Sequence, residues 1–379
     1  MAFVCDNFAA HSVAHFLTAP LKHLDRAGFE VWGVSTNAIE DSTTAALSAM
    51  CDRFVRLPGV TPLDLAARLR AESVDIAVDL NGLTAGHRLA AFAARPAPLA
   101  ATWLAYPSTT GLTSIDLRIV DSITDPPGSG AGEGNGAITT ESLVRIDPCF
   151  VCFTPLYDEH AAAAAAAPVE PSMRDHVAFA CFNNAAKITD RALGVWARVL
   201  ERVPRSRLLI KGRGLASERA RASLAARAQN AGLDPARVQV LPETATVAEH
   251  LEAYRRVDIQ LDTFPYNGTT TTCESLLMGV PVVTLQGEGG KQEGRHASRV
   301  GASLLTAAGL YEQVATNTDQ YVAAAARLAL ESDALARTRL GLRDRLLASA
   351  LCDAPAFAGR FGSALRTAWL KRCGSSCPV

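Results

Sequence analysis

One segment of the chain carries the residue types that bind a phosphate, at the spacing of a strand, a turn and a helix. It contains Asn267-Gly268, four threonines in succession and Glu274. An apolar run ending at Asp262 precedes these residues, and a second apolar run follows Gly279. This order predicts a buried strand, a loop, the start of a helix and another buried strand.

The chemistry of this segment follows from its predicted backbone. The start of a helix leaves N–H groups without intrahelical partners and presents the positive end of a dipole. Gly268 lets the backbone approach a ligand closely, and the hydroxyls of Thr269, Thr270 and Thr271 add donors. Together these groups predict a cradle for a pyrophosphate. Glu274, one turn into the helix, is placed to accept both hydroxyls of a ribose.

A simpler interpretation is that the threonines only cap the helix. One Ser or Thr is enough for a cap, so four in a row after a glycine favour ligand binding. Asp262 could also serve as a capping residue, and its role stays open.

Three further residues could take part in the chemistry, and each also has a simpler interpretation. Lys187 follows the apolar run 177–181 closely, which favours a place at the edge of a site over the usual surface position of lysine. His11 and His15 lie four residues apart at the start of a predicted helix and share a face. That spacing would suit a metal, but the sequence offers no evident third ligand.

The nine cysteines give no sign of a disulfide framework or a zinc site. Their number is odd, and they are scattered through a long chain. Cys149 and Cys152 form a CxxC pair inside an apolar, strand-like run, without a second pair at zinc-ribbon spacing. We expect ordinary reduced cysteines and no bound metal.

The elements that must position these residues alternate between short apolar runs and amphipathic stretches, which predicts α/β units around parallel sheets. Strands are expected at 2–5, 30–34, 53–56, 75–79, 99–104, 177–181, 207–211, 237–241, 258–262 and 281–285. Helices are expected at 13–27, with Gly28 as a C-cap, and at 189–200. Further helices are expected between the strand 207–211 and residue 229, around Glu274, and at 355–370.

A break in this rhythm divides the chain. The stretch 157–173 combines charges, an alanine run and two prolines, and it is interpreted as a linker. The predicted domains are therefore a lobe at 1–156, the linker 157–173, a lobe at 174–350, and a helix and tail at 351–379. Two α/β lobes would place a ligand in a cleft off the carboxyl ends of their strands.

Composition excludes several classes of partner. The chain has 379 residues, 49% of them apolar and 20% charged, with a net charge of −1. That balance offers no basic footprint for nucleic acid. No apolar run reaches the roughly 20 residues that span a bilayer, and the N-terminal stretch is too short for a signal peptide. We expect no membrane partner and a cytoplasmic location.

Several ordered motifs resemble the O-linked N-acetylglucosamine transferase family, with its SPINDLY-like and bacterial members, over nearly the whole chain. Besides the donor segment, the motifs are Asp79-Leu-Asn-Gly-Leu-Thr84, Arg95-Pro-Ala-Pro98, Trp103-Leu-Ala-Tyr-Pro107, Phe182-Asn-Asn-Ala-Ala-Lys-Ile188 and Ala297-Ser-Arg-Val300. The resemblance implies a GT-B fold of two Rossmann-like lobes, a UDP-sugar donor, inversion at the anomeric carbon and no metal or other cofactor.

The resemblance also implies roles for individual residues. Lys187 would neutralise the departing UDP, and His11 would line the acceptor side as the second catalytic candidate. The remaining matches concern the donor: His250 would stack on the uracil, the backbone of Ala245 would contact the base, and Thr270, Thr271 and Glu274 would hold the phosphates and ribose. Asn184 stands where the family usually has glutamine.

The chain departs from the family pattern at several positions that bear on activity. They are Asn7 in place of an acidic residue, Leu83 in place of Tyr or His, Ala105 and Ser108 in place of glycines, and Ala186 before the lysine. An apparent insertion lies between Gly287 and His296. The sequence begins at its first expected strand, whereas the family typically has tetratricopeptide repeats upstream that hold polypeptide acceptors. We therefore expect either a compact form or a fragment, and the acceptor stays open.

The sequence as a whole predicts a transferase that moves N-acetylglucosamine from UDP-N-acetylglucosamine to Ser or Thr hydroxyls of a polypeptide. Two alternatives stay open. One is a protein glucosyltransferase that acts on asparagine, and the other is an inactive UDP-binding remnant, which Asn7, Ala105, Asn184 and Ala186 would explain.

Overall fold

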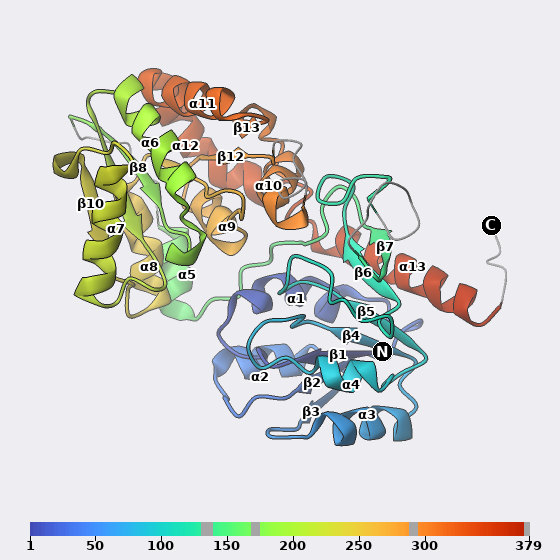
Figure 1. Cartoon of the computed structure of the whole chain (residues 1–379). Coiled ribbons are helices and arrows are strands. Elements are labelled where there is room, and N and C mark those ends of the chain that lie inside the picture. Colours follow the sequence, from blue (N-terminus) through green and yellow to red (C-terminus); the bar gives the residue numbers. More distant parts are fainter. Residues whose placement is uncertain (130–138, 168–174, 288–294, 375–379) are drawn as a thin grey trace. The chain divides into compact units, whose positions relative to one another are not determined.

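A computed structural model describes residues 1–129, 139–167, 175–287 and 295–374 of the chain. Contacts within the chain divide it into two compact units. The first comprises Met1–Asp158 together with Ala350–Val379, and the second comprises Glu159–Ser349 (Figure 1). Each unit is a parallel sheet covered by helices on both faces (Figure 1).

The first unit contains a seven-stranded parallel sheet in the order β3-β2-β1-β4-β5-β6-β7. Its strands are β1 (Ala2–Cys5), β2 (Trp32–Ser35), β3 (Arg53–Arg56), β4 (Ile76–Asp79), β5 (Leu99–Thr102), β6 (Leu117–Val120) and β7 (Ser142–Arg145). Its helices are α1 (Ser12–His23), α2 (Ser42–Ala49), α3 (Pro62–Ala71), α4 (Leu89–Ala93) and α13 (Ala354–Arg372). This strand order is that of a doubly wound, Rossmann-like sheet.

The second unit repeats the plan with six parallel strands in the order β10-β9-β8-β11-β12-β13. Its strands are β8 (Val177–Cys181), β9 (Ser206–Lys211), β10 (Val238–Leu241), β11 (Ile259–Leu261), β12 (Val282–Leu285) and β13 (Val314–Ala315). Its helices are α5 (Glu159–Ala166), α6 (Asp190–Arg202), α7 (Glu218–Asn230), α8 (Val247–Ala253), α9 (Thr270–Leu277), α10 (Val300–Ala307), α11 (Thr318–Leu330) and α12 (Ser332–Leu347). Two Rossmann-like units are the fold expected from the sequence.

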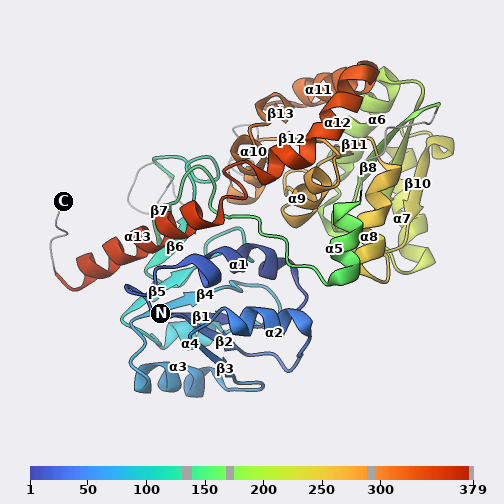
Figure 2. The same ribbon diagram turned by 180° about the vertical axis from the view of Figure 1, so that it is seen from behind.

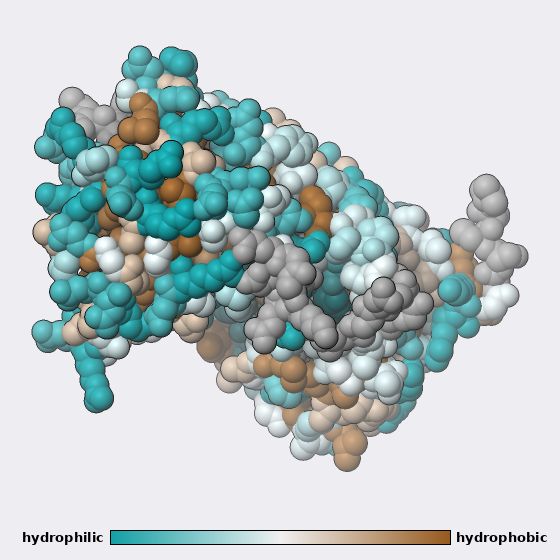
Figure 3. All heavy atoms as spheres, turned by 45° about the horizontal axis from the view of Figure 1, so that its top comes forward, coloured by the Kyte–Doolittle hydropathy of each residue, from teal (hydrophilic) through white to brown (hydrophobic). Residues whose placement is uncertain are grey.

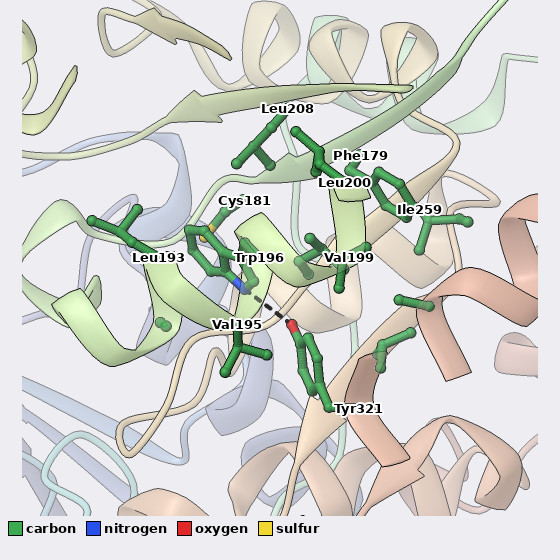
Figure 4. Close-up of a cluster of buried hydrophobic side chains, with 14 of the residues drawn as sticks. Phe179, Cys181, Leu193, Val195, Trp196, Val199, Leu200, Leu208, Ile259 and Tyr321 are labelled. Atoms are coloured by element: carbon green, nitrogen blue, oxygen red, sulfur yellow. Dashed lines mark hydrogen bonds between the residues drawn. The ribbon is translucent and has the colours of Figure 1, made fainter. Parts of the chain in front are cut away.

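Helix α6 shows why these sequences form these elements. Thr189 caps its N-terminus by accepting the Ala192 N–H, and its apolar residues recur at helical spacing on one buried face. Trp196 lies at the centre of that face, in the core of the second unit (Figure 4). Its indole Nε1 donates to the hydroxyl of Tyr321 on α11 at 3.3 Å, so the core also contains a satisfied polar pair.

The last helix returns to the first unit. The rings of Phe357 and Phe361 on α13 pack against Trp103, with centroids 6.1 and 5.0 Å away. Phe361 also meets Phe3 of β1 at 6.1 Å. The amphipathic helix expected at 355–370 therefore exists, and it completes the core of a unit whose other elements precede residue 159 (Figure 2).

Several expected boundaries differ from the structure. The first helix ends at His23, where the chain turns extended at Leu24, so Gly28 is not its C-cap. Cys149 and Cys152 lie in an irregular segment and not in a strand, and the backbone N–H of Phe153 bonds to the Leu351 carbonyl. Neither Cys149 nor Cys152 forms a disulfide, as expected of reduced cysteines.

The stretch interpreted as a linker contains the helix α5, which belongs to the second unit. Its small alanine side chains let it lie close to α8, and three of them are buried. Residues 168–173 of the expected linker lie outside the described residues. The short strands β6, β7 and β13 were not expected, because a run such as Leu-Arg-Ile-Val in β6 shows no strand periodicity and its Arg118 is buried against Asp125.

On the face shown in Figure 3, hydrophobic side chains are scattered in small groups among hydrophilic ones. Among the helices of the described residues, none is both long and apolar enough to cross a membrane.

Candidate functional site

The two central strands of the second sheet bring the segment 262–274, which we call the donor segment because the sequence predicts that it binds the donor, next to Asn183. Strands β8 and β11 are neighbours, and the order of the sheet reverses between them. Ligands of such folds bind outside the carboxyl ends of the strands at this point. Asn183 follows β8 and Asp262 follows β11, and the Nδ2 of Asn183 donates to the Oδ1 of Asp262 at 2.9 Å.

Asp262 organises the loop that follows it. Its buried carboxylate accepts the Gly268 N–H at 2.7 Å and the Thr284 hydroxyl at 2.7 Å. Burial raises the pKa of Asp262, while these hydrogen bonds and the charge of Lys187 lower it. Asp262 is therefore the anchor of the donor loop, a role that the sequence left undecided.

Gly268 is required by close packing. A Cβ at this position would lie 2.7 Å from Asn183 Oδ1 and 2.9 Å from the hydroxyls of Thr271 and Thr272. The Thr271 hydroxyl itself donates to Asn183 Oδ1 in a short hydrogen bond. Since the N–H of Gly268 bonds to Asp262, this glycine shapes the loop around protein groups.

Asn267 also turns its side chain inward. Its Nδ2 donates to the Thr263 carbonyl at 2.9 Å, and its Oδ1 accepts the Gly301 N–H at 3.2 Å. A Cβ on Gly301 would lie 2.7 Å from Asp262 Oδ2, so the start of α10 must also come this close. The side chain of Asn267 therefore supports the loop, and only its backbone carbonyl points to a predicted catalytic residue, Lys187.

The helix α9 begins as the sequence predicted, at the run of threonines. Thr269 occupies the N-cap position with φ −124° and ψ −81°, but its side chain makes no capping hydrogen bond. Thr269, Thr270 and Thr271 are all partly exposed. Capping therefore does not account for the hydroxyl of Thr269, and the binding of a phosphate by these threonines stays a prediction.

Lys187 lies at the end of a short 3-10 turn after β8 and reaches the donor loop. Its Nζ donates to the Asn267 carbonyl at 2.7 Å and lies 3.7 Å from the centre of the Tyr266 ring. Burial lowers the pKa of Lys187 to about 8, although the charge of Asp262 opposes this shift. The structure thus holds an ammonium group directly beside the start of α9.

A second group of side chains lies further along the same sheet edge. His250 on α8 contacts Glu274 on α9, with Nε2 and Oε2 3.0 Å apart. Its other ring nitrogen, Nδ1, is 2.6 Å from the Nζ of Lys211, the last residue of β9. The structure therefore brings His250 and Glu274, both expected in the site, into direct contact, and it adds a lysine beside His250 that the sequence analysis did not select.

Asn184 and Ala245 lie in exposed positions near these groups. The Oδ1 of Asn184 accepts the Ala186 N–H at 3.0 Å and caps the 3-10 turn that carries Lys187. The N–H of Ala245 donates to Glu249 Oε2 at 3.0 Å. Both groups thus have local partners, and their roles toward a donor stay predictions.

The first unit shows the same arrangement at its own reversal of strand order, between β1 and β4. The N–H of Asp6, after β1, donates to the Oδ1 of Asn81, after β4, at 2.9 Å. His11 follows as the N-cap of α1, and its Nδ1 accepts the Val13 N–H at 3.3 Å. A neutral ring in this arrangement carries its proton on Nε2.

His15 has a packing role. It is buried, its Nδ1 accepts the Leu156 N–H at 3.0 Å, and its ring meets Tyr157 at 4.8 Å. Within the described ranges, no group of three or more His, Cys, Asp or Glu residues could hold a metal ion. Packing and the Leu156 hydrogen bond therefore account for His15.

The departures from the family pattern fall in different environments. Gly82 packs so closely that a Cβ would lie 2.3 Å from the Cβ of Tyr106, next to Ala105. Leu83 is half exposed, and the N–H of Asn7 bonds to the buried Cys5 sulfur at 3.2 Å. The apparent insertion at 288–294 lies outside the described residues.

The site also contains residues that sequence reasoning missed. Asn183 and Lys211 are the clearest cases, and a signal existed for both. Each is a polar residue at the carboxyl end of an apolar strand, the same feature that singled out Lys187 and Asp262. Thr284 and Gly301 had no such signal, since only the tertiary fold brings them to Asp262.

Comparison with known proteins adds independent findings. The chain matches glycosyl transferase family 41 over residues 1–130 and 171–360. It is 39% identical to the probable UDP-N-acetylglucosamine–peptide N-acetylglucosaminyltransferase SPINDLY of Arabidopsis thaliana, a match that covers 100% of this chain and 40% of that protein. The similarly named SEC protein of Arabidopsis thaliana is 26% identical, with 100% of this chain and 38% of that protein covered.

Solved structures agree with the fold. The structure of an O-GlcNAc transferase mutant from Thermobaculum terrenum matches with a TM-score of 0.87 and 33% identity, over 98% of this chain and 68% of that one. The complex of Anabaena HepE with UDP and glucose is 11% identical with a TM-score of 0.56, over 97% of this chain and 99% of that one, a likeness of fold alone.

Proposed function

This chain belongs to glycosyl transferase family 41, and from that premise we propose that it transfers N-acetylglucosamine from UDP-N-acetylglucosamine to Ser or Thr hydroxyls of a polypeptide. The chain spans 40% of the length of the SPINDLY relative. The donor and the acceptor named for such relatives therefore enter here as parts of the proposal.

The observation that carries the proposal is the place of Lys187. Its ammonium group lies on the loop that opens helix α9, bonded to the Asn267 carbonyl at 2.7 Å. The helix start and the ammonium group concentrate positive charge where a diphosphate would lie. We propose that these groups neutralise the diphosphate without a metal ion.

The proposed reaction is a single displacement with inversion. The acceptor oxygen forms a bond to the anomeric carbon while the bond from that carbon to the diphosphate oxygen breaks, and UDP leaves with the electron pair. The acceptor hydroxyl releases its proton to water. Lys187 stabilises the charge that develops on the diphosphate, an effect worth roughly 3 kcal/mol in a preorganised site. His11, with its proton on Nε2, serves the acceptor side as a hydrogen-bond donor.

The remaining donor contacts follow the same proposal. His250 stacks on the uracil, the Ala245 backbone contacts the base, and Asn184 contacts the donor. Thr270 and Thr271 hold the phosphates, and Glu274 accepts from the ribose. Of these, Glu274 and His250 are already held in mutual contact, which would reduce the entropy lost when a nucleoside binds.

The first test is calorimetric titration with UDP, UDP-N-acetylglucosamine, UDP-glucose and GDP. We expect UDP to bind, and we expect Lys187→Ala to weaken that binding. Lys22→Ala is the matched control, because Lys22 is an exposed lysine of α1. Absence of UDP binding at millimolar concentration, or preference for GDP, would contradict the proposed donor.

The second test identifies the product. The chain, a peptide rich in serine and threonine, and UDP-N-acetylglucosamine would be incubated and analysed by mass spectrometry with fragmentation. Sugar on a hydroxyl residue supports the proposal. Glucose on asparagine would favour an asparagine glucosyltransferase instead, and UDP binding without any product would indicate an inactive binding protein.

A further inference from the structure

Lys211 occupies an unusual position for a lysine. It ends the buried strand β9 and is only 3% exposed. Its Nζ lies 4.9 Å from the centre of the Phe182 ring, 3.4 Å from the Thr244 hydroxyl and 2.6 Å from His250 Nδ1. In the described part of the chain, this ammonium group is hydrogen-bonded to an imidazole and a hydroxyl and forms no ion pair. A buried lysine in such surroundings is rare unless it has a specific role.

Hydrogen-bond chemistry then assigns the proton of His250. An ammonium group has only donors, so the Nδ1 of His250 must accept from Lys211. A neutral imidazole that accepts at Nδ1 carries its proton on Nε2. That proton points to Oε2 of Glu274 at 3.0 Å. The three residues form one directed chain, from lysine through histidine to carboxylate.

The alternative protonation, with a neutral lysine and an imidazolium, is less favourable. Burial lowers the pKa of Lys211 to about 8, while the charges of Glu274 and Glu243 oppose this shift. Even so, this value stays above neutral pH. At neutral pH the proton therefore rests on the lysine.

We propose that Lys211 is a positioning residue of the nucleotide site, which fixes His250 in the Nε2–H tautomer and so locks the His250–Glu274 pair. The inference rests on the proposed function, because that function makes His250 and Glu274 the ligands of base and ribose. Locked in this way, the imidazole presents an uncharged face for stacking, and Glu274 keeps its second oxygen for a ribose hydroxyl.

The position of Lys211 also predicts which kinetic constant it affects. Base and ribose are bound equally in the ground state and the transition state, because neither takes part in the bond changes. Loss of the lock should raise the donor KM and leave kcat nearly unchanged. Lys187, which faces the diphosphate in the proposal, should instead affect kcat.

The experiment uses Lys211→Met, Lys211→Arg and the control Arg207→Met, which alters an exposed residue of the same strand. The 15N NMR shifts of the His250 ring, assigned by comparison with His250→Gln, report the tautomer. We expect Nε2–H in the wild type, a mixture in Lys211→Met, and recovery of Nε2–H in Lys211→Arg. UDP affinity should fall about tenfold in Lys211→Met, the effect of losing one charged hydrogen bond.

A double-mutant cycle separates this role from a general loss of structure. If Lys211 acts through His250, then Lys211→Met should not weaken UDP binding further in a His250→Ala background. An Nδ1–H tautomer of His250 in the wild type would overturn the inference. The inference would also be wrong if Lys211→Met had the same His250 tautomer and the same UDP affinity as the control Arg207→Met. If Lys211→Met fails to fold, the His250 tautomer in the wild type and in Lys211→Arg still tests the inference.

The outcomes also separate this inference from the proposed function. If the wild type binds no nucleotide, the proposed function is wrong, and the nucleotide role of Lys211 falls with it, whatever the tautomer. If the wild type binds UDP but Lys211→Met changes neither tautomer nor KM, only the inference about Lys211 is wrong.

Discussion

At the scale of single residues, the charge of Lys187 depends on pH within the range where enzymes are assayed. Its pKa is lowered to about 8, mainly by burial. The charged form is the one that attracts a diphosphate, so kcat/KM for the donor should fall as pH rises through about 8. We expect the profile of the free enzyme to show this step in a pH series of initial rates.

The control for this prediction is Lys187→Arg, whose guanidinium stays charged across the same range. Its activity should be low, because Arg does not match the geometry of the ammonium group, but the step near pH 8 should be absent. A step that persists unchanged in Lys187→Arg would assign the titration to another group, of which Lys211 is the first candidate.

Asp262 shows how one buried carboxylate can determine the shape of a loop. Every group bonded to its carboxylate is a donor: the N–H groups of Thr263 and Gly268, the Thr284 hydroxyl and the Asn183 amide. Asp262→Asn would turn an NH2 group toward donors, leaving polar atoms unpaired in the core. We expect a loss of about 3 kcal/mol in the free energy of unfolding, measured by urea denaturation.

The matched control is the same change of aspartate to asparagine at an exposed position, Asp234. Asp234 is exposed, and its Oδ1 accepts the Ala236 N–H at 2.9 Å as the cap of a 3-10 turn. Asparagine caps as well as aspartate, so Asp234→Asn should change stability by less than about 0.5 kcal/mol. Equal effects at Asp234 and Asp262 would show that the carboxylate of Asp262 does not anchor the loop.

At the scale of elements, two glycines differ in what surrounds them: one lies where the backbone packs closely against other groups, and the other lies in open space on a helix. A Cβ on Gly268 would lie 2.7 Å from Asn183 Oδ1, whereas a Cβ on Gly194 of α6 would meet nothing within 4 Å. Gly268→Ala should therefore displace the donor loop and weaken UDP binding. Gly194→Ala should raise the free energy of unfolding by about 1 kcal/mol, because alanine favours the helix interior.

Calorimetry with UDP and thermal unfolding of the two variants would test this pair of expectations. UDP affinity should be unchanged in Gly194→Ala, which lies within the same unit but outside the loop. Wild-type affinity in Gly268→Ala would mean that the loop can move without consequence for the nucleotide.

The elements of the second unit were predictable because each carries its own local signal. The strand β8 is an unbroken apolar run, and α6 shows helical spacing behind a threonine cap. By contrast, β7 lacks apolar alternation and is paired only through its place beside β6. The end of the first helix was also not predicted. The helix continues past Pro20 and stops where Leu24 becomes extended, and both features depend on packing.

The candidate site was predictable to the extent that its residues lie in one segment. The order of Gly268, the threonines and Glu274 indicates a phosphate loop before any fold is known. The contacts of Thr271 with Asn183, of Asp262 with Thr284 and of His250 with Lys211 join elements far apart in sequence, so no local pattern reveals them. In a parallel sheet, the segments that follow different strands lie close together at the carboxyl edge, which produces contacts of this kind.

At the scale of the whole molecule, the C-terminal helix determines which part of the chain can fold alone. The first unit takes Phe357 and Phe361 from α13 into the core around Trp103. Phe361 is fully buried. Phe361→Ala should therefore lower the free energy of unfolding of the first unit by about 3–5 kcal/mol.

Two fragments test the division of the chain directly. The fragment 159–349 contains a complete six-stranded sheet and the core around Trp196 and Tyr321, so we expect cooperative thermal unfolding by circular dichroism. The fragment 1–158 lacks α13 and would expose the aromatic surface of Trp103 and Phe3. We expect it to unfold without cooperativity and to bind a hydrophobic dye, and to recover a cooperative transition when α13 is rejoined through a flexible linker. A cooperative transition in fragment 1–158 alone would show that α13 only covers this unit, because a helix that completes a core cannot be removed without loss of the fold.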